Sequence, residues 1–233
     1  MLRKTMVPGA TVKVLTSALF MTSAMAILAS PVSAIQITNV QVPFYEAITL
    51  KGGVLGSGNS ENIAIAGQIV LTTDAGRLGT WCVDLLHMIY IGGRYTYTAG
   101  PLQTNNTGSG PVTSPALTAT QIAEIGSLAA YGNALLKASP TNWNSAAVQA
   151  AIWDIEYNTT ATGSAKFNTE LAAVLALVPT LPHIAGVQIS DLGSQGQYLS
   201  QSLYTTDLPE PASFVVLGTG VICLAILRRR RQA

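Results

Sequence analysis

The sequence Thr80-Trp81-Cys82-Val83-Asp84-Leu85 lies inside an apolar run, 78–91, of the 233-residue chain. A second stretch, Ala147-Val148-Gln149-Ala150-Ala151-Ile152-Trp153, has the periodicity of a helix with an apolar face. We expect the chain to fold so that these two stretches meet. The cysteine of the first, Cys82, would then lie against the side chain of Gln149.

Patterns typical of strands flank the first stretch. Apolar and polar residues alternate between turn signals rich in Gly, Pro and Asn, which predicts half-buried strands. The strongest pattern places one set of residues on a single face: Ile63, Ile65, Gly67, Ile69 and Leu71. The predicted strands are 36–42, 44–50, 63–73, 95–98, 187–189 and 198–205.

Between residues 118 and 178 the pattern changes to that of helices. Thr118 and Gln121 have the spacing of a capping box and predict the start of the first helix, which extends to about residue 137. Asn144 or Ser145 is the expected cap of the second helix, and a third is predicted over 167–178. The expected core face of the second helix is Val148, Ala151, Ile152 and Ile155.

These patterns together predict an α+β fold for residues 35–205. We expect an antiparallel β-sandwich or barrel-like layer with an inserted helical subdomain at about 118–178. Residues 35–208 contain five basic and ten acidic residues, so their charge disfavours nucleic acid as a partner. Two histidines and one thiol without ligand spacing give little support for a metal site or a cofactor.

The first 34 residues have the pattern of a secretory signal peptide. A basic region is followed by an apolar, uncharged run over 14–28, and Pro31 interrupts it. Small residues then predict cleavage between Ala34 and Ile35. The basic residues are Arg3, Lys4 and Lys13.

The C-terminal segment, 206–233, has three parts in a fixed order. Pro209, Glu210 and Pro211 come first, then the apolar stretch 212–227, then a basic cluster. The apolar stretch is expected to form a short transmembrane helix with the cluster on the cytoplasmic side. The cluster consists of Arg228, Arg229, Arg230 and Arg231.

This tail resembles the sorting signal of PEP-CTERM proteins, which are exported proteins of Gram-negative, exopolysaccharide-making bacteria. The resemblance implies recognition of Pro209, Glu210 and Pro211 by an exosortase, a membrane-embedded cysteine peptidase that processes the tail. The chain would be held in the inner membrane by one helix until processing. It would then reside at the cell surface or outside the cell.

Cys82 and Gln149 have the functional groups needed for an internal thioester. Gln149, Trp153 and Glu156 have i, i+4, i+7 spacing, which puts the amide beside the core stripe and an indole one turn later. A thiolate that attacks the carboxamide would release ammonia and leave an activated acyl group. Trp81 and Trp153 could shield that bond from water, and His87 is a candidate base, whose effect nearby Asp84 would oppose.

The two stretches resemble the thioester domains of bacterial surface adhesins. Those domains have an aromatic-Cys-apolar motif, here Trp81-Cys82-Val83, and a later Gln-Ala-x-x-Trp type motif, here Gln149-Ala150-Ala151-Ile152-Trp153. The resemblance implies a Cys82–Gln149 bond and covalent capture of an amine- or hydroxyl-bearing protein or polysaccharide. Such a protein reacts once and does not turn over, so it would not be an enzyme.

Two other functions stay open from the sequence. Cys82 could be an inert buried thiol in a non-covalent structural or biofilm-matrix protein on the same export route. A Cys–His hydrolase built from Cys82 and His183 is the other, although no nucleophile motif surrounds Cys82.

Overall fold

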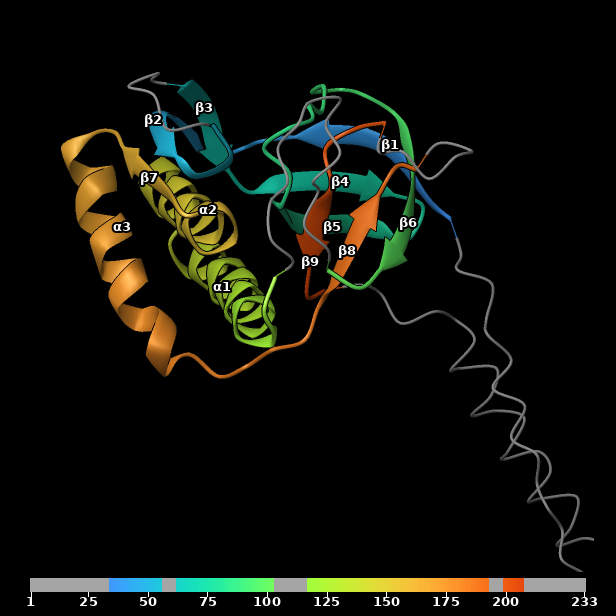
Figure 1. Cartoon of the computed structure of the whole chain (residues 1–233). Coiled ribbons are helices and arrows are strands. Elements are labelled where there is room, and N and C mark those ends of the chain that lie inside the picture. The colour runs from blue at the N-terminus through green and yellow to red at the C-terminus, as the bar shows by residue number, and fades with distance from the viewer. Residues whose placement is uncertain (1–33, 56–61, 103–116, 193–198, 208–233) are drawn as a thin grey trace, which may run out of the picture. The chain divides into compact units, whose positions relative to one another are not determined.

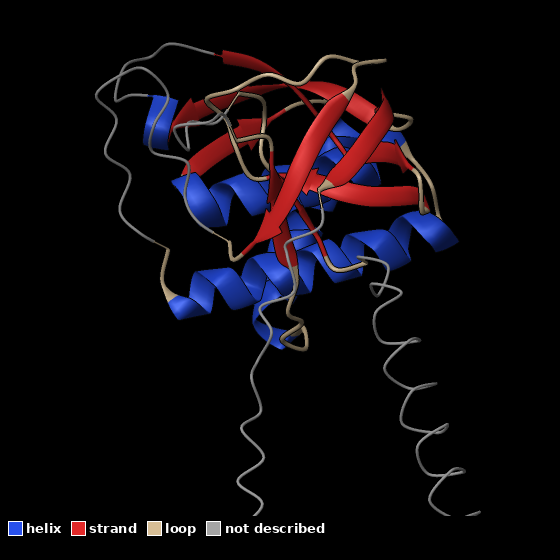
Figure 2. Ribbon diagram, turned by 90° about the vertical axis from the view of Figure 1, so that its right-hand side faces the viewer, coloured by secondary structure: helices blue, strands red, loops and turns tan. Residues whose placement is uncertain are grey.

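The computed structural model describes residues 34–55, 62–102, 117–192 and 199–207. The chain divides into two units between residues 31 and 32, and all described residues belong to the second. The predicted α+β class is confirmed: this unit contains a closed six-stranded antiparallel barrel, a three-stranded sheet and a helical part (Figure 1). Figure 2 shows the helices along one side of the strands.

The barrel strands follow one another around the closed sheet in the order β1, β4, β5, β9, β8, β6. Their bounds are β1 Ile35–Gln41, β4 Ile69–Thr73, β5 Gly76–Cys82, β9 Leu203–Thr205, β8 Val187–Ser190 and β6 Tyr95–Gly100. All of these pairings are antiparallel. The barrel therefore joins strands from both ends of the described chain, with β1 between β4 and β6, and β9 between β5 and β8.

The second sheet has the order β3-β2-β7 and packs on the helices. Its strands are β2 Tyr45–Gly52, β3 Asn62–Gly67 and β7 Thr159–Thr162. The helices are α1 Ala119–Ala138, α2 Asn142–Tyr157 and α3 Ala165–Leu177, with 3-10 turns at Gly53–Leu55 (η1) and Val178–Thr180 (η2). Helix α2 contacts α1, α3 and all three strands of this sheet, so it is the central element of the helical part.

The three helices agree with the sequence pattern, apart from the cap of α2. Thr118 and Gln121 form the predicted capping box of α1. The cap of α2 is Thr141, whose side chain accepts from the backbone N–H of Asn144, so the prediction of Asn144 or Ser145 was wrong. The helix therefore begins at Asn142, earlier than expected.

The prediction of one long strand over 63–73 was also wrong. The chain forms β3 and β4 in two different sheets, and Ile63 is 80% exposed whereas Leu71 is fully buried. The break is at Gln68, whose backbone N–H donates to the hydroxyl of Ser145 at 2.7 Å and whose side chain donates to Asn133. Bonds from two helices thus replace the strand ladder at this residue.

Helices α1 and α2 approach closely over Gly132, and this contact yields a stability prediction. A Cβ at this position would lie 2.4 Å from Cζ2 of Trp81 and 2.7 Å from Cγ1 of Val148. We expect Gly132→Ala to lower the free energy of unfolding by about 1–3 kcal/mol, because overpacking exceeds the gain of about 1 kcal/mol in helix propensity. Gly100→Ala is the control, because a Cβ there meets nothing within 4 Å. Urea unfolding of both variants measures the difference, and equal stabilities would contradict the prediction.

Candidate functional site

The two stretches singled out in the sequence meet in the interior. Cys82 ends β5, and Gln149 lies on α2 with its side chain fully buried. The backbone N–H of Cys82 donates to Oε1 of Gln149 at 2.8 Å, and Nε2 of Gln149 donates to the carbonyl of Cys82 at 2.8 Å. The carboxamide is therefore held at both ends by the main chain of the residue that carries the thiol. Gln149 was expected at the rim of the core face, but it lies inside it.

The thiol of Cys82 is buried and neutral. Its Sγ donates to the carbonyl of Asp84 at 3.2 Å and accepts from the backbone N–H of Asp84 at 3.4 Å. Burial raises the pKa of the Cys82 thiol well above its usual value, and the charges of Asp84 and Glu156 raise it further. The Asp84 backbone and the indole of Trp153 lower this pKa, but by less than burial raises it. A thiolate is therefore unfavourable in this state of the site.

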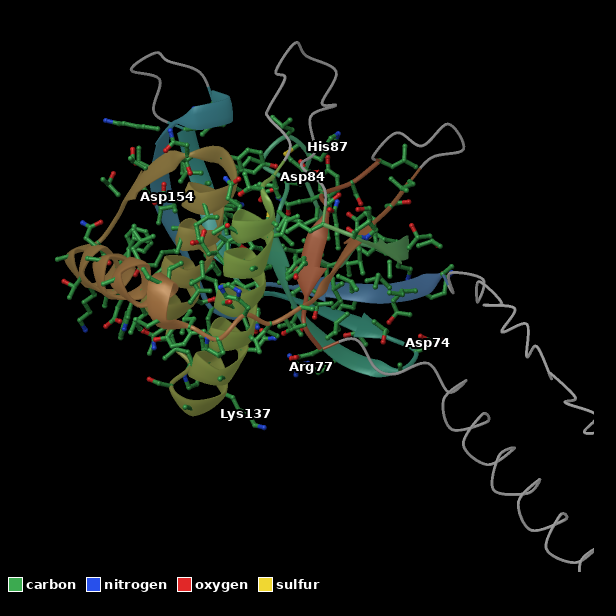
Figure 3. All side chains as sticks on the ribbon, turned by 60° about the horizontal axis from the view of Figure 1, so that its bottom comes forward. Asp74, Arg77, Asp84, His87, Lys137 and Asp154 are labelled. Carbon is green, nitrogen blue, oxygen red and sulfur yellow. The ribbon has the colours of Figure 1, made fainter. Side chains whose placement is uncertain are left out.

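Asp84 organises the segment that follows β5. Its fully buried carboxylate accepts from the backbone N–H groups of Leu86, His87 and Ser202. It also accepts from Nδ1 of His87, 2.8 Å from Oδ2, and Figure 3 shows these two side chains together. Because a carboxylate can only accept, the imidazole carries its proton on Nδ1. Asp84 thus holds residues 84–87 together and ties them to Ser202, the residue just before β9.

Glu156 lies two turns after Gln149 on α2 and is 5% exposed. Neither of its carboxylate oxygens has a hydrogen-bond partner within the described part of the chain. Burial, followed by the charge of Asp84, raises the pKa of Glu156 well above its usual value. The hydroxyl of Tyr157, which donates to the carbonyl of Val83, lies near enough to lower this pKa slightly. Burial in the core thus favours the protonated form of Glu156.

The two tryptophans differ in their relation to the thiol. Trp153 is 2% exposed, and its indole N–H lies close enough to Sγ to lower the pKa of the thiol, but makes no ordinary hydrogen bond to any described residue. The indole of Trp81 donates to the carbonyl of Ala129 and to Oδ1 of Asn133, so its N–H is used on α1. Of the two, Trp153 is the one beside the sulfur.

The other residues that the sequence singled out, two histidines and the signals at the termini, lie away from one another in the chain. His183 is exposed and has no hydrogen bond to Cys82, whereas His87 follows Cys82 closely. Ala34 is exposed, and Ile35 is the first residue of β1. Residues 1–33 and 208–233, with the predicted signal peptide and the sorting motif, lie outside the described residues. Within the described ranges no helix is long and apolar enough to cross a bilayer, and no cluster of His, Cys, Asp and Glu could hold a metal ion.

Three parts of the site were missed from the sequence. Asp84 was considered only as a charge that opposes thiolate formation. Its side chain in fact forms an Asx turn, because Oδ1 accepts from the backbone N–H of Leu86 two residues later. Glu156 was placed on the Gln149 face without a role. The contribution of Ser202 depends on the pairing of β5 with β9, for which no local signal exists.

Comparison with known proteins finds no matching family model, no similar curated protein and no matching solved structure. The functional interpretation therefore depends on the residues of the site and on the motifs of the two chain ends.

Proposed function

We propose that this protein is an exported surface or extracellular-matrix protein that captures amine- or hydroxyl-bearing partners through a thioester between Cys82 and Gln149. The observation that carries the proposal is the double hydrogen bond between the Gln149 carboxamide and the main chain of Cys82. It brings the carboxamide to the main chain of the residue that carries the sulfur. Both side chains are buried, and an activated acyl group survives only where water is excluded.

The reaction balances without an added reactant. The Cys82 sulfur bonds to Cδ of Gln149, the Cδ–Nε2 bond breaks, and ammonia leaves with the thiol proton. A partner amine then attacks Cδ, the C–S bond breaks, and the sulfur regains a proton. The partner ends up joined to Gln149 by an amide bond, and each protein molecule reacts once.

The proposed location of the protein depends on the sequence signals at its two termini. The signal peptide with cleavage between Ala34 and Ile35 would bring the body across the inner membrane. The tail with Pro209, Glu210 and Pro211 would hold it there until an exosortase processes it. The captured partner would then be a protein or polysaccharide of the cell surface or matrix.

A structural role without covalent chemistry is the second candidate, and one observation favours it. The hydrogen bonds that fix Gln149 also satisfy the buried N–H and C=O of Cys82, as an ordinary structural side chain would. Burial raises the pKa of the thiol, which suits an inert cysteine. In this case the protein would serve the matrix through non-covalent contacts.

The mass of the purified body, residues 35–207 produced in an exported form, distinguishes these functions. We expect a mass lower than the sequence predicts by one ammonia, and complete addition of methylamine. Cys82→Ala and Gln149→Ala should each restore the full mass and abolish the addition. A full-mass body with an alkylatable thiol would support the structural role instead. Ester hydrolysis that is lost in both Cys82→Ala and His183→Ala would support the hydrolase.

A further inference from the structure

Strand β3 lies at one edge of the three-stranded sheet. Among the described strands β2 alone pairs with it, and their six residue pairs are in continuous register (Figure 1). Every second residue of an edge strand directs its backbone N–H and C=O groups outward, and natural edges are usually guarded by charges, prolines or bulges. β3, Asn62–Gly67, has the sequence NIAIAG, which contains no charge and no proline. This edge is therefore a template for another strand.

The outer face of β3 is apolar as well as exposed. Ile63 is 80% exposed and Ile65 is 59% exposed, whereas Ala66, on the opposite face, is buried. In the register with β2, Ile63 lies opposite Thr49 and Ile65 lies opposite Ala47. Residues that pair directly share a face, so these four side chains form an uncharged patch beside the edge. The occupant that suits both the main chain and the patch is an extended strand with alternating apolar residues.

The order of residues in β3 makes it complementary to a second copy of itself. A twofold axis pairs identical antiparallel strands so that the numbers of two opposite residues have a constant sum. Because side chains alternate between faces, only even sums keep the exposed faces of both strands on one side. A pairing centred on Ala64 sets Ile63 of each copy opposite Ile65 of the other, which makes two isoleucine pairs. Centring on either isoleucine makes only one.

We propose that β3 is a self-association edge through which two copies of this chain form one continuous six-stranded sheet. The strand order is β7-β2-β3-β3-β2-β7, with the twofold axis at Ala64. One row across the joint consists of Thr49 and Ile63 from one copy and Ile65 and Ala47 from the other. Cross-strand pairs of β-branched residues stabilise sheets, and no charges meet in this row. The pairing does not involve Cys82, so it goes beyond the function proposed above.

The other end of the sheet favours a closed pair over open-ended assembly. β7, Thr159–Thr162, consists of Thr and Ala. Joining β3 to β7 of the next copy would repeat without closing and would produce filaments. It would also set isoleucine against threonine, whereas joining β3 to β3 sets isoleucine against isoleucine. A twofold dimer therefore makes better use of the apolar edge.

The first test is the double variant Ile63→Lys with Ile65→Lys. The proposed register places the introduced ammonium groups of the two copies directly opposite each other, where like charges are destabilising. Met88→Lys with Ile91→Lys is the matched control, because it adds two lysines at positions 71% and 67% exposed outside the sheets. Sedimentation measures the mass of the full chain in a mild detergent. We expect dimers of the unchanged chain and of the control, and a dissociation constant raised at least about tenfold in the double variant.

Disulfide trapping tests the register. Directly opposite residues of an antiparallel pair have Cα atoms about 4.5–5.5 Å apart, within the reach of a disulfide. Diagonal neighbours are about 7–8 Å apart, beyond that reach. Ile63→Cys and Ile65→Cys are purified separately, mixed and oxidised. We expect the mixture to form covalent dimers on a non-reducing gel, and each variant alone to form far fewer.

Several results would overturn the inference: a chain that is monomeric at every concentration, a double variant that dimerises as tightly as its control, filaments, or equal trapping in the mixture and in the single variants. Hydrogen exchange identifies another occupant, because slow exchange of amides 63–66 in a monomer would show that a segment of the same chain covers the edge. If the lysine variant does not fold, the trapping result decides. Ammonia loss is not measured in any of these experiments, so failure of the thioester function leaves the dimer standing.

Discussion

Gln149→Glu is expected to lower the free energy of unfolding by about 3–5 kcal/mol at neutral pH, the usual cost of an uncompensated buried charge. In the native site Oε1 accepts from the backbone N–H of Cys82 and Nε2 donates to its carbonyl. A carboxylate can reproduce the first bond, but its second oxygen would face the carbonyl with no proton between them. The deficit should shrink as pH falls, because a protonated carboxyl can donate to that carbonyl.

The measurement is best made in a Cys82→Ala background, where no thioester can form and the backbone partners remain. Gln121→Glu is the control: it makes the same chemical change in the capping box of α1, where the side chain is partly exposed and donates to the carbonyl of Ile155. That change should cost less than about 1 kcal/mol. If both variants lose the same free energy of unfolding, the two hydrogen bonds between Gln149 and Cys82 contribute no more to stability than those of Gln121.

Asp84→Ala is the second large prediction, with an expected loss of about 3–5 kcal/mol. It leaves the backbone N–H groups of Leu86, His87 and Ser202 without their acceptor, and the last of these is buried. The imidazole of His87 also loses its partner. Chemical denaturation measures the loss, and removal of the buried charge should at the same time lower the pKa of both Cys82 and Glu156.

Asp74→Ala provides the comparison for Asp84→Ala. Asp74 is an exposed acid in the turn between β4 and β5, and Figure 3 shows it well away from Asp84. Its removal should change stability by no more than about 0.5 kcal/mol. A similar result for Asp84→Ala would show that the segment after β5 is held by other contacts.

Local chemistry explains which features could be predicted from the sequence. The capping box of Thr118 and Gln121 depends on residues three positions apart, and the helical periods depend on one face of each helix. The division of 63–73 could not be predicted, because Gln68 is captured by Ser145 and Asn133, which lie far along the chain. β7 was missed because four Thr- and Ala-rich residues form a strand only when β2 is available to pair with them.

The candidate site shows the same limit. The sequence suggested that the thiol of Cys82 and the side chain of Gln149 meet; the structure joins that side chain to the main chain of Cys82. The acceptor role of Asp84 toward Ser202 could not be inferred, because it depends on the registry of β5 with β9. The burial of the Glu156 carboxylate without a hydrogen-bond partner among the described residues depends on the elements packed around it. The spacing of residues in the sequence does not predict it.

The position of β9 bears on the order in which the molecule can assemble. This strand ends at Thr205, supplies the neighbour of Cys82 in the sheet, and follows directly on the N–H that reaches Asp84. In a growing chain that does not yet include residues 202–205, β5 lacks its second neighbour and the barrel is open. The surroundings of Cys82 are therefore complete only after residues 202–205 have joined the fold.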